Sequence, residues 1–244
     1  MKSFLVALQF LTRIPVKFKE IPTEKQTANS LIYYPLVGFF IGVILYLVNL
    51  SLGSVDEILR GAIVLTVWII ITGALHLDGL ADSADALVGG FGDKEKTLAI
   101  MKDPYCGPVG VTTLVVILLL KFALITSLTS ESVILLILAP LLARASIIWS
   151  FLTIPYMRQQ GLGSAMANHF SYKAGVITLC VVAFFAFLIT GWLAVLIIFG
   201  MMVAYLGLRK VLLSRIDGMT GDTLGAQLEI AEILVLLLGI LWLS

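Results

Sequence analysis

LRGAIVLTVWIIITGALHLDGLADSADAL, residues 59–87, is the segment that most clearly indicates the class of the fold. An α-helix rises 1.5 Å per residue, so about 20 mostly apolar residues cross the roughly 30 Å hydrocarbon core of a bilayer. Residues 59–80 have this length and composition. We therefore predict a membrane-spanning helix that runs directly into three aspartates, Asp78, Asp82 and Asp85.

The composition of the whole chain agrees with a membrane protein. Hydrophobic residues make up 60% of the 244 positions and charged residues 13%, and the mean hydropathy is +1.07. An ordinary soluble domain is about 45–50% apolar and about 25% charged. Lipid must cover the excess apolar surface, and a net charge of +1 gives no support to a nucleic-acid partner.

Hydropathy predicts an all-α, polytopic transmembrane bundle of about seven spans, with residues 1–244 forming a single integral membrane domain. The expected spans are residues 31–52, 59–80, 108–128, 133–154, 174–190, 192–208 and 224–243. The apolar run after Lys2 is too short to span and is not followed by a cleavage site typical of a signal peptide. We expect it to form an interfacial or re-entrant helix.

The distribution of cations predicts the orientation. Thirteen of the 16 lysines and arginines fall in the N-terminal segment and in the loops after the second, fourth and sixth spans. Because positively charged loops stay in the cytoplasm, we expect the N-terminus on the cytoplasmic side. The membrane is expected to be the cytoplasmic (inner) membrane of the cell. The aspartates of residues 78–85 then lie on the cytoplasmic side.

Asp78, Asp82 and Asp85 are spaced i, i+4 and i+7, which stacks them on one helical face. Like charges so placed repel one another, and a low dielectric constant nearby strengthens the repulsion. A hard cation such as Mg²⁺ offsets that cost, because it takes carboxylate oxygens and completes its shell with water and phosphates. The alternative is a solvated helix end whose carboxylates contact lysines of the loops.

Two further segments carry candidate site residues. The first is the loop MKDPYCGPVG, residues 101–110, in which Lys102 is a candidate phosphate ligand and Asp103 a further carboxylate. The second precedes the last span, where Asp217 and Asp222 lie in a glycine-rich turn and Glu229 lies inside the apolar run. A carboxylate within a span suggests a function, whereas Asp222 has the alternative of being a helix cap.

Lys121 and Arg144 are the cations within the third and fourth spans. We expect both to face the interior of the bundle, with the planar guanidinium of Arg144 the better anion clamp. The polar loop that follows the fourth span, residues 155–170, predicts either a nucleotide-binding segment or a plain connection.

Several motifs, taken together and in order, resemble the cobalamin synthase (adenosylcobinamide-GDP ribazoletransferase) family. They are HLDGLADSADAL (76–87), KDPYCGPVG (102–110), GLG (161–163) and DGMTGDTLGA (217–226), with QFLTRIPV (9–16) and YPLVGFFIG (34–42). The resemblance covers essentially the whole chain. CDP-alcohol phosphotransferases have a related aspartate-rich helix, but this chain has Asp82 where their motif has arginine.

The resemblance implies a Mg²⁺-dependent membrane enzyme of the last steps of cobalamin (vitamin B12) assembly. Such an enzyme joins α-ribazole or its 5′-phosphate to adenosylcobinamide-GDP and releases GMP. On this interpretation Asp78, Asp82, Asp85 and Asp222 hold Mg²⁺, with Asp217 in support, and Asp82 or Asp85 accepts the proton of the ribose hydroxyl. Lys102 and Arg144 are expected to bind phosphate, and Asp103 and Glu229 are secondary candidates.

Two alternatives remain open on the sequence. A CDP-alcohol phosphotransferase that makes phospholipid would release CMP, and a transporter would use the charges inside the spans. No inverted repeat is visible, which argues against many transporters. The predicted partners are the small-molecule substrates and the lipid bilayer, while an oligomer or a complex with other enzymes of the pathway is left open.

Overall fold

A chain within hydrocarbon must pair its own backbone N–H and C=O groups, and an α-helix does this within one segment. The computed structural model describes residues 1–243 and is helical over most of them. The elements are α1 (Lys2–Leu11), α2 (Glu24–Ala28), the 3₁₀ turn η1 (Asn29–Tyr33), α3 (Tyr34–Ser51), α4 (Glu57–Thr72), α5 (Leu75–Gly89), α6 (Lys94–Ile100), α7 (Pro108–Thr126), α8 (Leu135–Thr153), α9 (Leu162–His169), α10 (Tyr172–Thr190), α11 (Trp192–Ile216) and α12 (Gly221–Leu243).

The predicted all-α, polytopic bundle is confirmed. Within residues 1–243, six helical segments are long and apolar enough to cross a membrane, and the bent pair α4 and α5 brings the number to seven if it counts as one span. The first span is longer than predicted, because α2, η1 and α3 form one segment, Glu24–Ser51. Helix α11 likewise continues two turns beyond the predicted end at residue 208.

The segment predicted as the second span, residues 59–80, is not one continuous helix. Helix α4 ends at Thr72, and Gly73 (φ 65°) and Ala74 (φ 58°) both take left-handed backbone conformations. The chain then turns by 87° into α5. A glycine inside an apolar run leaves no mark on hydropathy, although it allows the left-handed conformation at little cost.

The break is held by the N-terminal segment. The backbone N–H of Arg13 donates to the carbonyl of Ile71 at 2.7 Å, and the side chain of Arg13 lies where a Cβ at residue 73 would be. Helix α1 is 10 residues long and buries Val6, Ala7 and Leu11. It is therefore a short helix packed on the bundle, as expected from its length.

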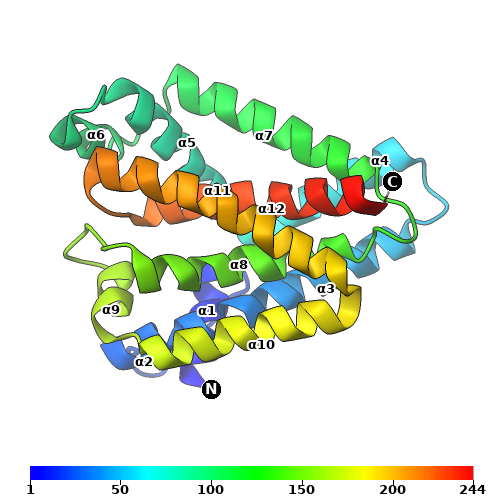
Figure 1. Ribbon diagram of the computed structural model, residues 1–244, viewed down its shortest axis with the longest axis horizontal. Helices are drawn as coiled ribbons and strands as arrows, with labels where there is room; N and C mark the ends of the chain where they lie inside the picture. The colour runs from blue at the N-terminus through cyan, green and yellow to red at the C-terminus, as the bar shows by residue number, and fades with distance from the viewer. Residues whose placement is uncertain (244) are drawn as a thin grey trace.

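Helices α8 and α12 lie in the middle of the bundle, and α7 and α10 lie at its outside (Figure 1). About two thirds of the spanning window of α8 is buried within the protein, against 11% for α10. Helix α12 packs against α5 and α8, and α3 packs against α8. The start of α12 is thus surrounded by protein, which makes it a suitable wall for a site.

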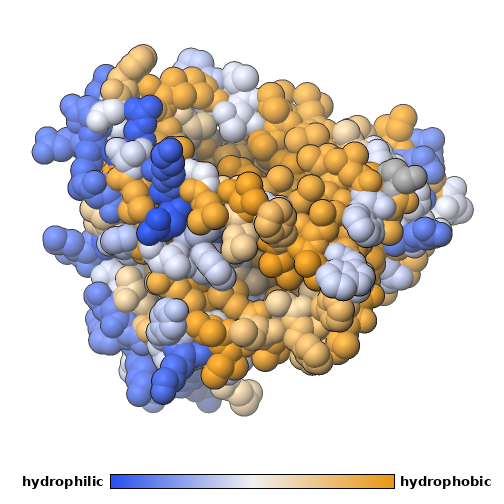
Figure 2. Space-filling view, viewed as in Figure 1, coloured by the Kyte–Doolittle hydropathy of each residue, from blue (hydrophilic) through white to orange (hydrophobic). Residues whose placement is uncertain are grey.

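Hydrophilic side chains gather at the end of the molecule formed by α6, α9 and the start of α12, which we call the polar end (Figure 2). Apolar side chains cover most of the middle of the visible face, as expected for lipid contact. Helix α5 lies beside α6 at the polar end and runs across the bundle rather than along it. Its aspartates therefore belong to a helix at the polar end.

Helices α5 and α12 cross at very short range through Gly79 and Gly225. A Cβ at Gly79 would lie 2.8 Å from the carbonyl oxygen of Asp222, and one at Gly225 would lie 3.1 Å from that of His76. Any larger residue at Gly79 would push the helices apart. This crossing brings the first turn of α12 against the first turn of α5.

Candidate active site

The three aspartates of the α5 motif lie on one helix, as their spacing predicts. Asp78 is exposed, and Asp82 and Asp85 are partly buried. None of them forms an ion pair with a lysine in the described part of the chain. The alternative of a helix end neutralised by loop lysines therefore has no support from the geometry.

The carboxylate of Asp85 is occupied by the backbone of α7. One oxygen accepts the N–H of Gly107 at 2.7 Å, and the other accepts the N–H of Gly110 at 2.9 Å. The first N–H groups of a helix have no partner within it and carry a partial positive charge, so a carboxylate binds there favourably. Asp85 thus fixes the start of α7 to α5, and its oxygens are less available for a metal or a proton than those of Asp82.

Asp82 lies in an acidic environment outside the straight membrane-spanning helices. Burial, and then the charges of Asp78, Asp222 and Asp85, together raise the pKa of its carboxyl group to about 6, while Arg158 opposes them. Close carboxylates disfavour each other's ionised forms. A carboxyl group with a pKa near 6 is ionised at neutral pH and is still basic enough to accept a proton.

Asp222 joins this site from α12. It lies in the first turn of the helix and forms an ion pair with Arg158. The cap of α12 is Thr220, whose hydroxyl oxygen accepts the N–H of Thr223 at 3.3 Å. The alternative that Asp222 is only a helix cap therefore does not hold, because its carboxylate is engaged by Arg158.

Arg158 is the residue that the sequence interpretation missed. It lies in the loop between α8 and α9, which is fixed to the turn before α12 by a short parallel bridge. The N–H of Met157 donates to the carbonyl of Met219 at 2.9 Å, and the N–H of Met219 donates to that of Pro155 at 2.8 Å. The sequence did contain a signal for this residue. Arg158 is a cation among polar residues and glycines, in the loop that was predicted either to bind a nucleotide or to be a plain connection.

A cavity of about 290 Å³ opens between these elements. Asp78, Asp222 and Arg158 give it a charged wall, the glycines of the α8–α9 loop give it another, and the end of α1 and Tyr34 close its apolar side. Tyr156 stacks on Phe151, with ring centroids 5.9 Å apart. The cavity thus combines carboxylates, one guanidinium, flexible backbone and aromatic faces, which suits a phosphorylated ligand with a ring system.

His76 lines the same cavity, but as a packing residue. It is 5% exposed. We therefore count it with the packing residues of the cavity wall and not with its charged groups.

Four predicted residues lie away from the cavity, at the surface of the polar end or beyond it. Lys102 and Asp103 are exposed in the loop between α6 and α7, where Asp103 accepts the N–H of Tyr105 at 3.0 Å. Asp217 forms an exposed ion pair with Lys94 at 2.6 Å. Glu229 lies deeper in the bundle. None of these four side chains lines the cavity.

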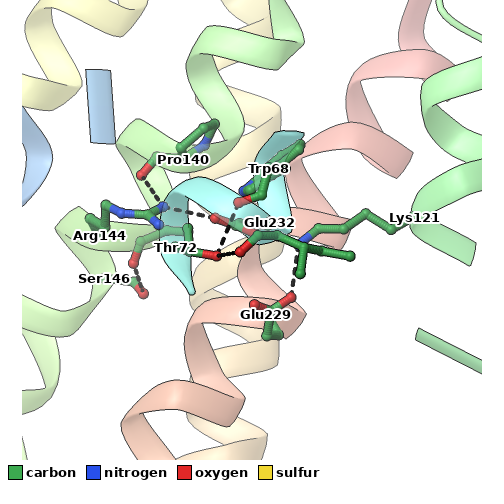
Figure 3. A network of polar contacts seen from close by, with 10 residues as sticks. Trp68, Thr72, Lys121, Pro140, Arg144, Ser146, Glu229 and Glu232 are labelled. Carbon is green, nitrogen blue, oxygen red and sulfur yellow. Dashed lines mark hydrogen bonds and ion pairs between the residues drawn. The ribbon is translucent and has the colours of Figure 1, made fainter. Parts of the chain in front are cut away.

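Arg144 is also remote from the cavity, inside a buried charge network with Lys121, Glu229 and Glu232 (Figure 3). Its guanidinium is 0% exposed and donates to Glu232 at 2.7 Å and to the carbonyl of Pro140 at 3.1 Å. The prediction that Lys121 and Arg144 face the interior is confirmed. The prediction that Arg144 binds phosphate does not fit this position, because its guanidinium is fully buried and does not line the cavity.

The network balances its own charge. Lys121 donates to Glu229 at 2.7 Å and to Glu232 at 2.5 Å, and its ammonium lies 4.4 Å from the centre of the Trp68 ring. Two cations thus face two carboxylates at the junction of α7, α8 and α12. A balanced set needs no transported ion to compensate it, which removes the main support for a transporter.

Asp78, Asp82 and Asp222 supply only carboxylate oxygens, the donors that hard divalent cations prefer. Among the described residues, no group of three His, Cys, Asp or Glu side chains is arranged to hold a metal unaided. Mg²⁺ fits such a site, because it is commonly bound by one or two carboxylates together with phosphates of the substrate. The geometry therefore suits a cation that arrives with a phosphorylated ligand.

The family model described as cobalamin-5-phosphate synthase matches residues 3–240. The adenosylcobinamide-GDP ribazoletransferase of Pseudomonas fluorescens Pf0-1 is 47% identical over 232 residues, which cover 95% of this chain and 96% of that protein. The protein of the same name from Acinetobacter baumannii is 48% identical over 233 residues, 95% of this chain and 94% of its own. No solved structure matches.

The charge network generates a stability prediction. Glu232→Leu leaves two buried cations facing one carboxylate, so we expect a loss of about 3–5 kcal/mol in the free energy of unfolding. The double variant Lys121→Met/Glu229→Leu removes one cation with one anion and leaves Arg144 paired with Glu232. It should unfold at a higher temperature than either of its single variants, as measured by thermal unfolding in detergent. A double variant less stable than both singles would contradict the balanced network.

Proposed function

Because the chain belongs to the cobalamin-5-phosphate synthase family, we propose that it joins adenosylcobinamide-GDP to α-ribazole, or to its 5′-phosphate, and releases GMP. The family match extends over residues 3–240 and so includes every element that builds the cavity. The relatives that carry the ribazoletransferase name are similar over nearly their whole length. The observation that carries the proposal is the cavity itself, where two helices and a loop bring Asp78, Asp222 and Arg158 together at the polar end.

The reaction is a displacement at phosphorus. A hydroxyl group of the ribose of α-ribazole attacks the phosphorus that carries the cobinamide, the bond between that phosphorus and the oxygen of GMP breaks, and GMP leaves. The hydroxyl proton must pass to a base. Catalysis of such a transfer consists mainly of aligning the two substrates and neutralising phosphate charge.

We propose Mg²⁺ as the cofactor, held by Asp78 and Asp222 together with phosphates of the substrate, while Asp85 keeps α7 and α5 in place. When bound, Mg²⁺ would neutralise charge on the pyrophosphate. The oxygens of Asp85 are already engaged by Gly107 and Gly110, so they are not available to the cation.

We propose that Asp82 is the general base. Of the two aspartates considered for this role, Asp82 has the raised pKa and Asp85 has both oxygens occupied by backbone donors. Asp82 is partly buried and lies one helical turn beyond Asp78, although it is not itself among the residues that line the cavity. Asp78, on the exposed first turn, is left to hold the cation.

We further propose that residues 1–244 form one integral membrane domain whose polar end faces the cytoplasm. Most lysines and arginines belong to the segments of this end, which follows the positive-inside rule. A polar corrinoid substrate would then reach the cavity from the cytoplasm.

The central experiment is incubation of the purified protein with adenosylcobinamide-GDP and α-ribazole, with GMP measured by chromatography. We expect GMP to form with Mg²⁺ and to fall to background with EDTA, because the pyrophosphate charge is then not neutralised. Asp78→Asn should lower the rate by at least about tenfold. GMP release at the wild-type rate by Asp78→Asn would contradict the proposed cation site. Release of CMP from a CDP-alcohol, with no GMP formed, would instead favour a phospholipid synthase.

The raised pKa of Asp82 predicts the pH dependence of the rate. The base must be ionised, so the rate of GMP release should decline as the pH falls through about 6, where Asp82 becomes protonated. Asp82→Asn has no base at this position and should lose about 10²–10⁴-fold in rate at pH 7. A pH–rate profile of both proteins tests this, and an Asn variant with the wild-type rate at pH 7 would exclude Asp82 as the base.

The orientation is tested with the native cysteine of the loop between α6 and α7. Cys106 is exposed in that loop at the polar end. A membrane-impermeant thiol reagent should label it in inside-out vesicles and leave it unlabelled in intact spheroplasts. Cys106→Ser is the control for labelling at Cys180. Labelling of Cys106 in intact spheroplasts would reverse the proposed orientation.

A further inference from the structure

The cavity is lined by more negative than positive side chains. Asp78 and Asp222 are carboxylates, and Arg158 is the one cationic side chain among the residues that line it. A pyrophosphate brings further negative charge into this space, so the protein's own contribution to its binding must come from Arg158. Lys102 and Arg144, the cations first considered for this task, do not line the cavity.

The chain before Arg158 is fixed by backbone hydrogen bonds, whereas the chain after it is less constrained. The hydrogen bond from the N–H of Met157 to the carbonyl of Met219 fixes the residue directly before it. Beyond it the chain passes Gly161, which has φ 99° and open space around its Cα. The side chain of Arg158 is 35% exposed and that of Asp222 is 19% exposed. The guanidinium can therefore leave Asp222 without displacing the packed core.

We propose that Arg158 binds the pyrophosphate of the nucleotide substrate, and that its ion pair with Asp222 is the resting arrangement that substrate binding replaces. The inference rests on the proposed function and adds a residue and an exchange of partners to it. A guanidinium donates two parallel hydrogen bonds to phosphate oxygens, a geometry that lysine does not offer. When Arg158 turns to the phosphates, the carboxylate of Asp222 becomes available for the cation that accompanies them.

This exchange gives the site a counter-charge in both states. Without substrate, the positive charge of Arg158 offsets the repulsion between Asp222 and Asp78. With substrate, the cation takes over at Asp222 while Arg158 faces the pyrophosphate. A merely structural ion pair, holding the α8–α9 loop to α12, would predict loss of stability on mutation and no specific change in phosphate binding.

The first test measures binding of GDP, which carries a pyrophosphate, to the purified full-length protein by calorimetry in EDTA. Arg158→Ala should weaken GDP binding at least about tenfold, or about 1.4 kcal/mol, and Arg158→Lys should weaken it less. Arg215→Ala, also at the polar end but not part of the cavity lining, is the matched control and should bind GDP as the wild type does. Should Arg158→Ala fail to fold, as judged by its unfolding temperature, Arg158→Gln replaces it with the same expected loss. Unchanged GDP affinity in the Arg158 variant overturns the proposal.

The second test separates the exchange of partners from simple repulsion. Asp222→Asn should raise GDP affinity in EDTA several-fold while it lowers turnover with Mg²⁺, because it releases Arg158 but removes a cation ligand. In the Arg158→Ala background the gain in affinity should shrink. Asp78→Asn also removes a negative charge but has no ion pair with Arg158, so its effect on GDP affinity should be the same in both backgrounds. Equal effects of Asp222→Asn with and without Arg158 overturn the resting ion pair.

Turnover distinguishes this inference from the proposed function. If the wild-type protein forms no GMP from adenosylcobinamide-GDP and α-ribazole, the proposed function fails. If it forms GMP and Arg158→Ala keeps the wild-type KM for adenosylcobinamide-GDP, the role of Arg158 alone fails. We expect KM for adenosylcobinamide-GDP to rise about tenfold in Arg158→Ala, with KM for α-ribazole unchanged.

Discussion

Glu232 joins three helices inside the bundle, and the position of α12 depends on it. Its carboxylate accepts hydrogen bonds from Lys121 of α7 and from Arg144 of α8, and Lys121 also pairs with Glu229. Charges within a bilayer are costly unless they are paired, so these helices have few alternative arrangements that keep every charge satisfied. The ion pairs of Glu229 and Glu232 fix the position of α12 against α7 and α8. They therefore also fix the position of Asp222, in the first turn of α12.

The close crossing of α5 and α12 links the position of α12 to that of α5, and so relates Asp222 to Asp78 in the cavity wall. Gly79 and Gly225 allow the two backbones to approach until a Cβ at either position would contact the other helix. Asp85 then fixes α7 to α5 through the N–H groups of Gly107 and Gly110. The carboxylates of α5 and α12 are therefore presented by rigid helices, whereas Arg158 comes from a loop. This division suits a site in which a cation is held by fixed groups and a large substrate is received by a movable one.

The acidic groups of the chain thus fall into two sets with different tasks. Glu229 and Glu232 are neutralised inside the protein and stabilise the bundle. Among residues 1–243, Asp78 and Asp82 form no ion pair, and Asp222 pairs with Arg158, which we propose turns to the substrate. Carboxylates gathered at the polar end without permanent counter-charges suit a cation and a phosphate, which is the chemistry of the proposed ribazole transfer.

The class of the fold and the placement of the α5 aspartates on one helix follow from the sequence alone. Apolar runs of span length require helices in lipid, and an i, i+4, i+7 spacing places Asp78, Asp82 and Asp85 on one face whatever surrounds them, because both follow from the geometry of a single helix. The interior positions of Lys121 and Arg144 also follow from the sequence, since the cost of a charge in lipid allows little else. The break of the second span at Gly73, the binding of Asp85 to the start of α7, and the lining of the cavity by Arg158 rather than Arg144 became visible in the three-dimensional structure. Those facts depend on contacts between segments far apart in the chain, such as Arg158 with Asp222, and on the way the helices cross, which no local periodicity records.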